Sequence, residues 1–144
     1  HDTGVILAPG SGSRAKNWPL ERFLELADRL AAAGRPTMWL LGPAELERRE
    51  FARVPRERAM VNEPIVTVAA ALSRASACVS NDSGVVHLSA ALGRPTTVLF
   101  GPSDARVWAP RGDHVHVVRS ATGEMSAIGV AEVMATLERG IAEQ

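Results

Sequence analysis

The first residues able to perform chemistry lie in a loop near the N-terminus, PGSGSRAKNWP, residues 9–19. Its two glycines let the backbone approach a ligand closely, because glycine carries no Cβ atom. Ser11 and Ser13 bring hydroxyl groups that can donate hydrogen bonds, and Lys16 brings a compact positive charge suited to a phosphate. Taken alone, the loop fits a phosphate site and a plain surface turn about equally well.

The same loop contains GSGSRA, which matches the G-x-G-x-x-[GA] pattern of dinucleotide-binding proteins. In that motif the loop opens a helix whose N-terminus holds the pyrophosphate. Here Pro19 disfavours helical backbone in the residue before it, so the helix is expected to begin near Pro19, too late for Ala15 to lie inside it. The second predicted strand also ends without the acid that would bind a ribose, the nearest being Glu45. We therefore interpret the match as accidental.

A second polar cluster, SNDSGVVH at residues 80–87, follows the fourth predicted strand and opens a helix. Free backbone N–H groups at a helix start attract anions, although Asp82 or Ser83 could instead cap the helix. His87 could face a phosphate or simply pack. Because parallel strands end at one edge of a sheet, this cluster and the Lys16 loop are expected on the same edge, which indicates a ligand site.

The sequence leaves two possible roles for Glu45, Trp18 and Trp108, and predicts one for Trp39. Glu45 opens the second predicted helix, where it could compensate the helix dipole or accept hydrogen bonds from ribose hydroxyls. Trp18 could support the loop or pack in the core, Trp39 is expected in the core, and Trp108 could border a cleft or pack.

The elements that must position these loops follow from apolar runs and turn signals. Short apolar runs predict strands at 5–8, 38–41, 59–61, 77–80, 96–100 and 114–118. Helical spacing and stop signals predict helices at 19–33, 44–53, 65–75, 85–92 and 130–141, with a long loop at 101–113. Strands alternating with helices predict an α/β fold with a doubly wound parallel sheet, whose ligands bind where the strand order reverses.

Composition and charge narrow the class of protein. The 144 residues are one domain in length, and 46% hydrophobic content is enough to bury a core. Basic and acidic residues number 16 each, so no global basic field attracts nucleic acid, and any anion site is local. The lone Cys78 is interpreted as a buried core residue of a cytoplasmic protein. No apolar run approaches the ~18 residues that span a membrane.

In order and spacing, four pieces resemble glycosyltransferase family 9, the ADP-heptose:lipopolysaccharide heptosyltransferases. The pieces are PG followed by KNWP in residues 9–19, GPAE at 42–45, NDSGVVHL at 81–88, and AALGRP at 90–95 running into LFGP at 99–102. Members have two Rossmann-like domains that face each other across a cleft, the GT-B fold. The resemblance implies that residues 1–144 form the C-terminal, donor-binding domain alone, with the N-terminal acceptor domain absent from this chain.

The resemblance also implies where a nucleoside-diphosphate sugar binds. Lys16 would neutralise the diphosphate, with Ser11 and Ser13 beside it. Ser83 and Gly84 would hold phosphate at the helix N-terminus.

Three further roles come from the same resemblance. Glu45 would bind the nucleotide ribose, and Asp82 would hydrogen-bond the transferred sugar. His87 would lie close to the phosphates, and the backbone at 63–65 would lie near the base.

The implied reaction is inverting transfer of heptose or a related sugar to a lipopolysaccharide-type, lipid-linked acceptor. Lys16 and Asp82 are the predicted catalytic residues. Lys16 is predicted because charge that develops on the leaving diphosphate needs fixed positive groups, and Asp82 because of its implied hydrogen bond to the transferred sugar. No metal or other cofactor is expected besides the donor, an ADP-sugar or another nucleoside-diphosphate sugar. The family's general base belongs to the N-terminal domain, so this chain is expected to bind donor but barely to catalyse. The resemblance places the enzyme in the cytoplasm, or peripherally on the inner face of the inner membrane.

Other functions remain open. A non-catalytic nucleotide-binding or scaffold module could keep the same fold, and a third alternative is a GT-B-like nucleotide-sugar epimerase. A receiver-type or flavodoxin-like domain would share the strand pattern but would not explain KNWP together with DSG at 82–84.

Overall fold

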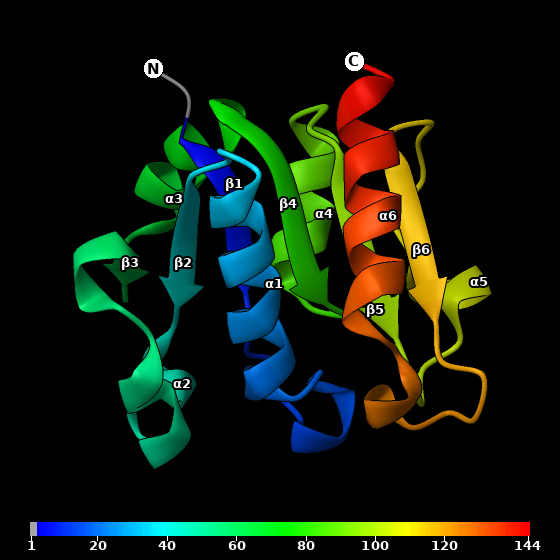
Figure 1. The fold of residues 1–144 in the computed structure, drawn as a ribbon, viewed down its shortest axis with the longest axis horizontal. Helices are drawn as coiled ribbons and strands as arrows, with labels where there is room; N and C mark the ends of the chain where they lie inside the picture. The colour runs from blue at the N-terminus through cyan, green and yellow to red at the C-terminus, as the bar shows by residue number, and fades with distance from the viewer. Residues whose placement is uncertain (1–2) are drawn as a thin grey trace.

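A six-stranded parallel sheet forms the centre of the chain, whose computed structural model describes residues 3–144 (Figure 1). The strands are β1 (Gly4–Ala8), β2 (Thr37–Leu41), β3 (Ala59–Val61), β4 (Ala75–Asn81), β5 (Thr96–Phe100) and β6 (Val115–Arg119). Their order is β3-β2-β1-β4-β5-β6, and every neighbouring pair is parallel. The predicted doubly wound, Rossmann-like sheet of about six strands is confirmed.

The strand order reverses between β1 and β4. The chain builds the sheet outward from β1 to β3, and then returns to place β4 on the other side of β1. Ala8 at the end of β1 lies in register with Ser80 near the end of β4. The loops that leave these two strands therefore start side by side, at the point where ligands bind in open α/β sheets.

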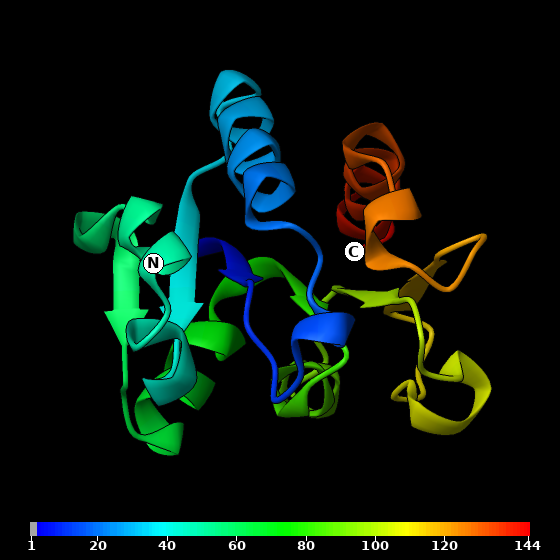
Figure 2. The same cartoon turned by 90° about the horizontal axis from the view of Figure 1, so that it is seen from below.

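Helices cover both faces of the sheet (Figure 2). The helices α1 (Leu20–Ala32) and α6 (Val130–Ala142) pack on one face, in a core that includes Val5, Leu7 and Val79. The helices α3 (Ile65–Ser73) and α4 (Gly84–Ala91) lie on the other face, where α3 and part of α4 pack around Ile6 and Cys78. Side chains of one strand alternate between the two cores because successive Cβ atoms point to opposite faces.

Two segments differ from their predicted structure. The predicted helix over 44–53 is wrong, because this segment divides between a short α2 (Pro43–Leu46) and a 3₁₀ turn, η2 (Arg49–Arg53). Only Phe51 in the segment is buried, and a short helix without an apolar face has little packing to stabilise it. The predicted loop over 101–113 contains a short helix, α5 (Ala105–Trp108), where the Asp104 carboxylate caps the first turn by accepting from the Arg106 N–H.

The remaining 3₁₀ turns are η1 (Arg14–Lys16), η3 (Arg56–Arg58) and η4 (Met125–Ala127). Strand β4 begins two residues earlier than the predicted 77, because α3 already ends at Ser73. Within residues 3–144, none of the helices combines the length and apolar character that crossing a bilayer requires.

Two core predictions are confirmed. Trp39 is 1% exposed and packs in the core beneath α1. The Cys78 thiol is fully buried, and this burial raises its pKa to about 12, which keeps it protonated and unreactive at neutral pH.

Candidate functional site

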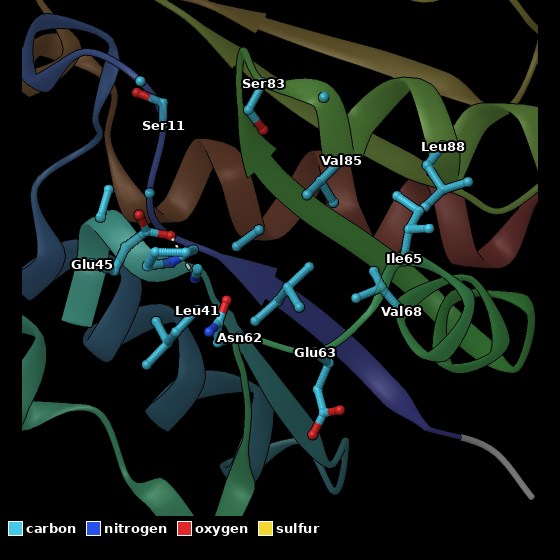
Figure 3. Close-up of a pocket in the computed structure, with 18 residues that line it drawn as sticks. Ser11, Leu41, Glu45, Asn62, Glu63, Ile65, Val68, Ser83, Val85 and Leu88 are labelled. Carbon is cyan, nitrogen blue, oxygen red and sulfur yellow. Dashed lines mark hydrogen bonds between the residues drawn. The ribbon is translucent and has the colours of Figure 1, made fainter.

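A cavity of about 530 Å³ opens beyond the carboxyl ends of β1, β2 and β3 and against the start of α4 (Figure 3). Its volume is within the range of small-molecule sites. Ser11 lines it from the β1–α1 loop, Glu45 from α2, Asn62 from the β3–α3 turn, and Ser83 and Val85 from the start of α4. Four strand-exit segments that are far apart in the sequence therefore converge on one hollow.

The β1–α1 loop is tied to the end of β4 by the side chain of Asn81. The Asn81 Oδ1 atom accepts a hydrogen bond from the Trp18 backbone N–H at 2.9 Å, and its Nδ2 atom donates to the Pro9 carbonyl at 2.9 Å. At the far end, the Trp18 Nε1–H donates to the Ile128 carbonyl at 2.9 Å. Trp18 is 1% exposed and packs edge-on against Phe23, so this tryptophan supports the loop and belongs to the core at once.

The Ser11 hydroxyl is engaged within its own loop. It lies 2.7 Å from the Ser13 carbonyl and 2.6 Å from Asn17 Oδ1, and it accepts from the Ser13 N–H at 3.2 Å. In contrast, among residues 3–144 the backbone N–H groups of Ser11 and Gly12 meet no hydrogen-bond acceptor. The loop therefore offers an incoming anion its backbone amides, while the Ser11 hydroxyl keeps the loop in shape.

Lys16 and Asp82 form an ion pair across the switch point. The Lys16 Nζ atom, in η1, lies 3.5 Å from the Asp82 Oδ2 atom, which follows β4. The side chains are 41% and 9% exposed, respectively, so the ammonium remains open to solvent while the carboxylate is largely enclosed. The two predicted catalytic residues thus come together, beside the residues that line the cavity.

The start of α4 is free of side-chain caps. Ser83 has the extended backbone of an N-cap residue, but no side chain among the described residues caps the helix. Its hydroxyl lies 3.1 Å from the Ser80 hydroxyl instead. The N–H groups of Gly84 and Val85 meet no acceptor within residues 3–144, so the positive end of the α4 dipole faces the cavity unneutralised.

The Glu45 carboxylate is held at the opposite side of the cavity. Its Oε1 atom accepts from the Gly42 N–H at 3.0 Å, the dashed line in Figure 3, and so caps the N-terminus of α2. A Cβ atom on Gly10 would overlap this carboxyl group, which shows that Glu45 packs directly over the loop backbone. Glu45 therefore caps the N-terminus of α2 and also lines the cavity.

Four predicted site residues lie outside the cavity lining: the ion-paired Lys16 and Asp82, and also Ser13 and His87. The Ser13 side chain is half-exposed on the loop, and His87 is exposed on α4. The cavity thus gathers Ser11, Glu45 and Ser83 with Gly84, while the Lys16–Asp82 pair stands next to them.

The family follows from comparison with known proteins. The model of glycosyltransferase family 9 (heptosyltransferase) matches residues 2–136 of the chain. The chain belongs to glycosyltransferase family 9. The expected family is confirmed by this match over nearly the whole sequence.

Relatives of this family 9 chain agree in sequence and fold. It is 30% identical to lipooligosaccharide heptosyltransferase 2 of Haemophilus influenzae over 124 residues, which cover 77% of the chain and 34% of the relative. It superimposes on E. coli ADP-heptose lipopolysaccharide heptosyltransferase II with a TM-score of 0.86 at 26% identity, covering 96% of the chain and 46% of that structure. E. coli heptosyltransferase WaaC with ADP gives a TM-score of 0.84 at 27% identity, covering 96% and 44%. The chain spans about a third of the length of the curated relative.

The sequence did not predict all parts of the cavity and of its supporting contacts. Apolar side chains of Ile65, Val68, Val85 and Leu88 gather along one side of the cavity and form an apolar wall (Figure 3). The sequence predicted only that these residues lie on helices, and the position of α3 and α4 beside the strand ends directs them into a cavity. Asn81 was also missed, since no local pattern shows which buried amide reaches a loop 63 residues away.

Proposed function

We propose that the chain is the donor-binding domain of an inverting glycosyltransferase, which binds a nucleoside-diphosphate sugar at the switch point. The proposal rests on one observation: two groups of free backbone N–H donors, which attract anions, lie in the same cavity. The free amides of Ser11 and Gly12 and the uncapped start of α4 line one cavity, and the Lys16 ammonium stands next to it. Backbone amides, a helix N-terminus and a lysine together fit a diphosphate.

The other parts of the cavity fit the rest of an adenosine nucleotide. The Glu45 carboxylate has a second oxygen that can accept from ribose hydroxyls, and the apolar wall offers a surface for a flat base. The names of two similar structures support adenine, because one is WaaC with ADP and the other is an ADP-heptose heptosyltransferase. We propose an ADP-sugar donor, with heptose or a related sugar as the transferred group.

In the proposed reaction an acceptor hydroxyl attacks the anomeric carbon from the face opposite the diphosphate. The new carbon–oxygen bond forms as the bond to the diphosphate oxygen breaks, and the hydroxyl proton passes to a general base. Lys16 and the start of α4 stabilise the negative charge that develops on the leaving diphosphate. In this proposal Asp82, which is enclosed beside Lys16, accepts a hydrogen bond from the sugar.

The complete enzyme, in this proposal, pairs the chain with an N-terminal domain that binds a lipid-linked saccharide and supplies the general base. The acceptor is of the lipopolysaccharide type, and the reaction takes place in the cytoplasm or at the inner face of the inner membrane. The chain alone then binds donor without appreciable transfer. A transfer assay with an ADP-sugar and a lipopolysaccharide-type acceptor tests this, and full activity of the isolated chain would contradict it.

Calorimetric titration with ADP tests donor binding directly. We expect saturable binding, weakened about tenfold or more by Lys16→Ala because a charge-assisted hydrogen bond to phosphate contributes about 1.5–3 kcal/mol. Glu45→Gln should weaken ADP more than inorganic diphosphate, since the ribose contact is absent from the latter. Arg106→Ala, an exposed cation of α5 outside the cavity, is the matched control and should leave affinity unchanged. A chain that shows no saturable binding of ADP or UDP would contradict the donor-binding role and would fit a scaffold module that keeps only the fold.

A further inference from the structure

The Asn81 side chain is a fully buried amide that touches both ends of the β1–α1 loop. It is 0% exposed, and its two polar atoms bind Pro9 at the start of the loop and Trp18 at the end, each at 2.9 Å. The Nδ2 atom also lies 3.4 Å from Asn17 Oδ1, the atom that receives the Ser11 hydroxyl. One side chain thereby closes the loop and reaches into its interior.

The chemistry of the two partners requires an amide at this position. The Trp18 N–H can only donate and the Pro9 carbonyl can only accept, so the residue between them must present one acceptor and one donor. Asparagine does so with a short, fully buried side chain, whereas a carboxylate would turn a second acceptor towards the Pro9 carbonyl. If this side chain were lost, two loop groups would be left buried without partners, which is costly enough to move the loop.

The loop closed in this way carries the groups proposed to bind diphosphate. The free amides of Ser11 and Gly12 and the Lys16 side chain all lie between Pro9 and Trp18. Asn81 directly precedes Asp82, the ion-pair partner of Lys16, so the same strand end fixes the loop and its cation. The Trp18 indole also donates to the Ile128 carbonyl, so the end of the loop has a second anchor, while Asn81 links that end to the start of the loop at Pro9.

We infer that Asn81 is a positioning residue for donor binding, which sets the shape of the β1–α1 loop so that its amides and Lys16 reach the diphosphate together. This inference rests on the proposed function, because it assigns a role in diphosphate binding. Asn81 itself lies outside the cavity lining and acts only through the loop. Its contribution is therefore preorganisation of the site.

A double-mutant cycle on ADP affinity tests the inference. Asn81→Ala should weaken ADP about tenfold, and Lys16→Ala, which costs about tenfold in the unaltered chain, should cost less than about twofold in the Asn81→Ala background. The matched control is Ser89→Ala, which removes a buried hydroxyl bonded at 2.7 Å to Thr96, away from the loop. Ser89→Ala should leave both ADP affinity and the effect of Lys16→Ala unchanged, although it also lowers the melting temperature.

Each outcome decides between a positioning role and a merely structural one. If Asn81→Ala and Lys16→Ala are additive, or if Ser89→Ala weakens ADP as much, the positioning role is overturned while donor binding stands. If the unaltered chain shows no saturable ADP binding, the proposed function and the inference fall together. Should Asn81→Ala not fold, Asn81→Ser keeps a hydroxyl for one partner, and the same cycle should then show an intermediate loss and intermediate coupling.

Discussion

Two proline-containing segments follow strands at the same edge of the sheet, and they are held in different ways. The loop over 9–18 is bonded to distant parts of the chain, with 63 residues between Trp18 and Asn81 and 110 between Trp18 and Ile128. Within the described residues, the hydrogen bonds of segment 103–111 all stay inside that segment, such as the Asp104–Arg106 pair. The first loop buries its tryptophan, whereas the second leaves Trp108 58% exposed.

The comparison shows that long-range hydrogen bonds distinguish the loop over 9–18, which we propose binds diphosphate, from segment 103–111. A loop that already has its binding shape does not lose conformational freedom when a ligand arrives. The loop over 9–18 satisfies this condition because buried groups fix both of its ends. Segment 103–111 lacks such bonds, and it contributes nothing to the cavity lining.

Replacement of the two tryptophans should give the largest difference between the segments. Trp18→Ala removes a fully buried indole with its bond to Ile128, and should lower the free energy of unfolding by about 3–5 kcal/mol. Trp108→Ala removes an exposed ring and should change it by less than about 0.5 kcal/mol. Urea denaturation followed by circular dichroism measures both. Equal losses would show that the two segments are held alike.

Replacement of Gly10 and of Gly12 by alanine should have different effects on stability and on ADP binding. A Cβ atom on Gly10 would overlap the Glu45 carboxyl group, which must then turn away and release the Gly42 N–H. Gly10→Ala should therefore cost about 1 kcal/mol of stability and weaken ADP binding as Glu45→Gln does. Gly12→Ala meets no atom within 4 Å and should cost less than about 0.5 kcal/mol. A stable Gly10→Ala chain with unchanged ADP affinity would remove Glu45 from the site.

The Lys16–Asp82 pair should show a small coupling that depends on salt. A double-mutant cycle with Lys16→Met and Asp82→Asn should give about 0.2–1 kcal/mol, since Lys16 is 41% exposed and solvent screens the pair. The coupling should shrink in about 1 M salt, where the Debye length is about 3 Å. Thermal denaturation of the four chains gives the value, and a coupling that resists salt would mean that the ion pair is more enclosed than the structure shows.

The sequence predicted the strands and helices around the candidate site better than the contacts between its side chains. Apolar runs and helix stops gave the six strands and the main helices, because local periodicity reflects which face is buried. Lys16 and Asp82 came together as strand-end residues of a parallel sheet must. The role of Asn81 and the apolar wall depend on contacts between distant segments, which local patterns do not carry. The predicted helix over 44–53 failed for a related reason, since its charged residues matched helical propensity without a face to bury.

The smallest effect should come from the local ion pair of the second segment. The Arg106 side chain and backbone N–H bind the Asp104 carboxylate and lower its pKa below the ordinary value of 3.8. Because the pKa of Asp104 is lower in the folded chain than in the unfolded chain, the ion pair favours the folded chain at pH values above 3.8. This contribution is lost as the pH falls through the lowered pKa. NMR titration of the Asp104 carboxyl carbon should give a midpoint below 3.8, and Arg106→Ala should return it towards 3.8. Since both side chains are solvent-exposed, we expect no measurable change in melting temperature or in ADP affinity from Arg106→Ala. A clear loss of either would mean that segment 103–111 contacts the rest of the site after all.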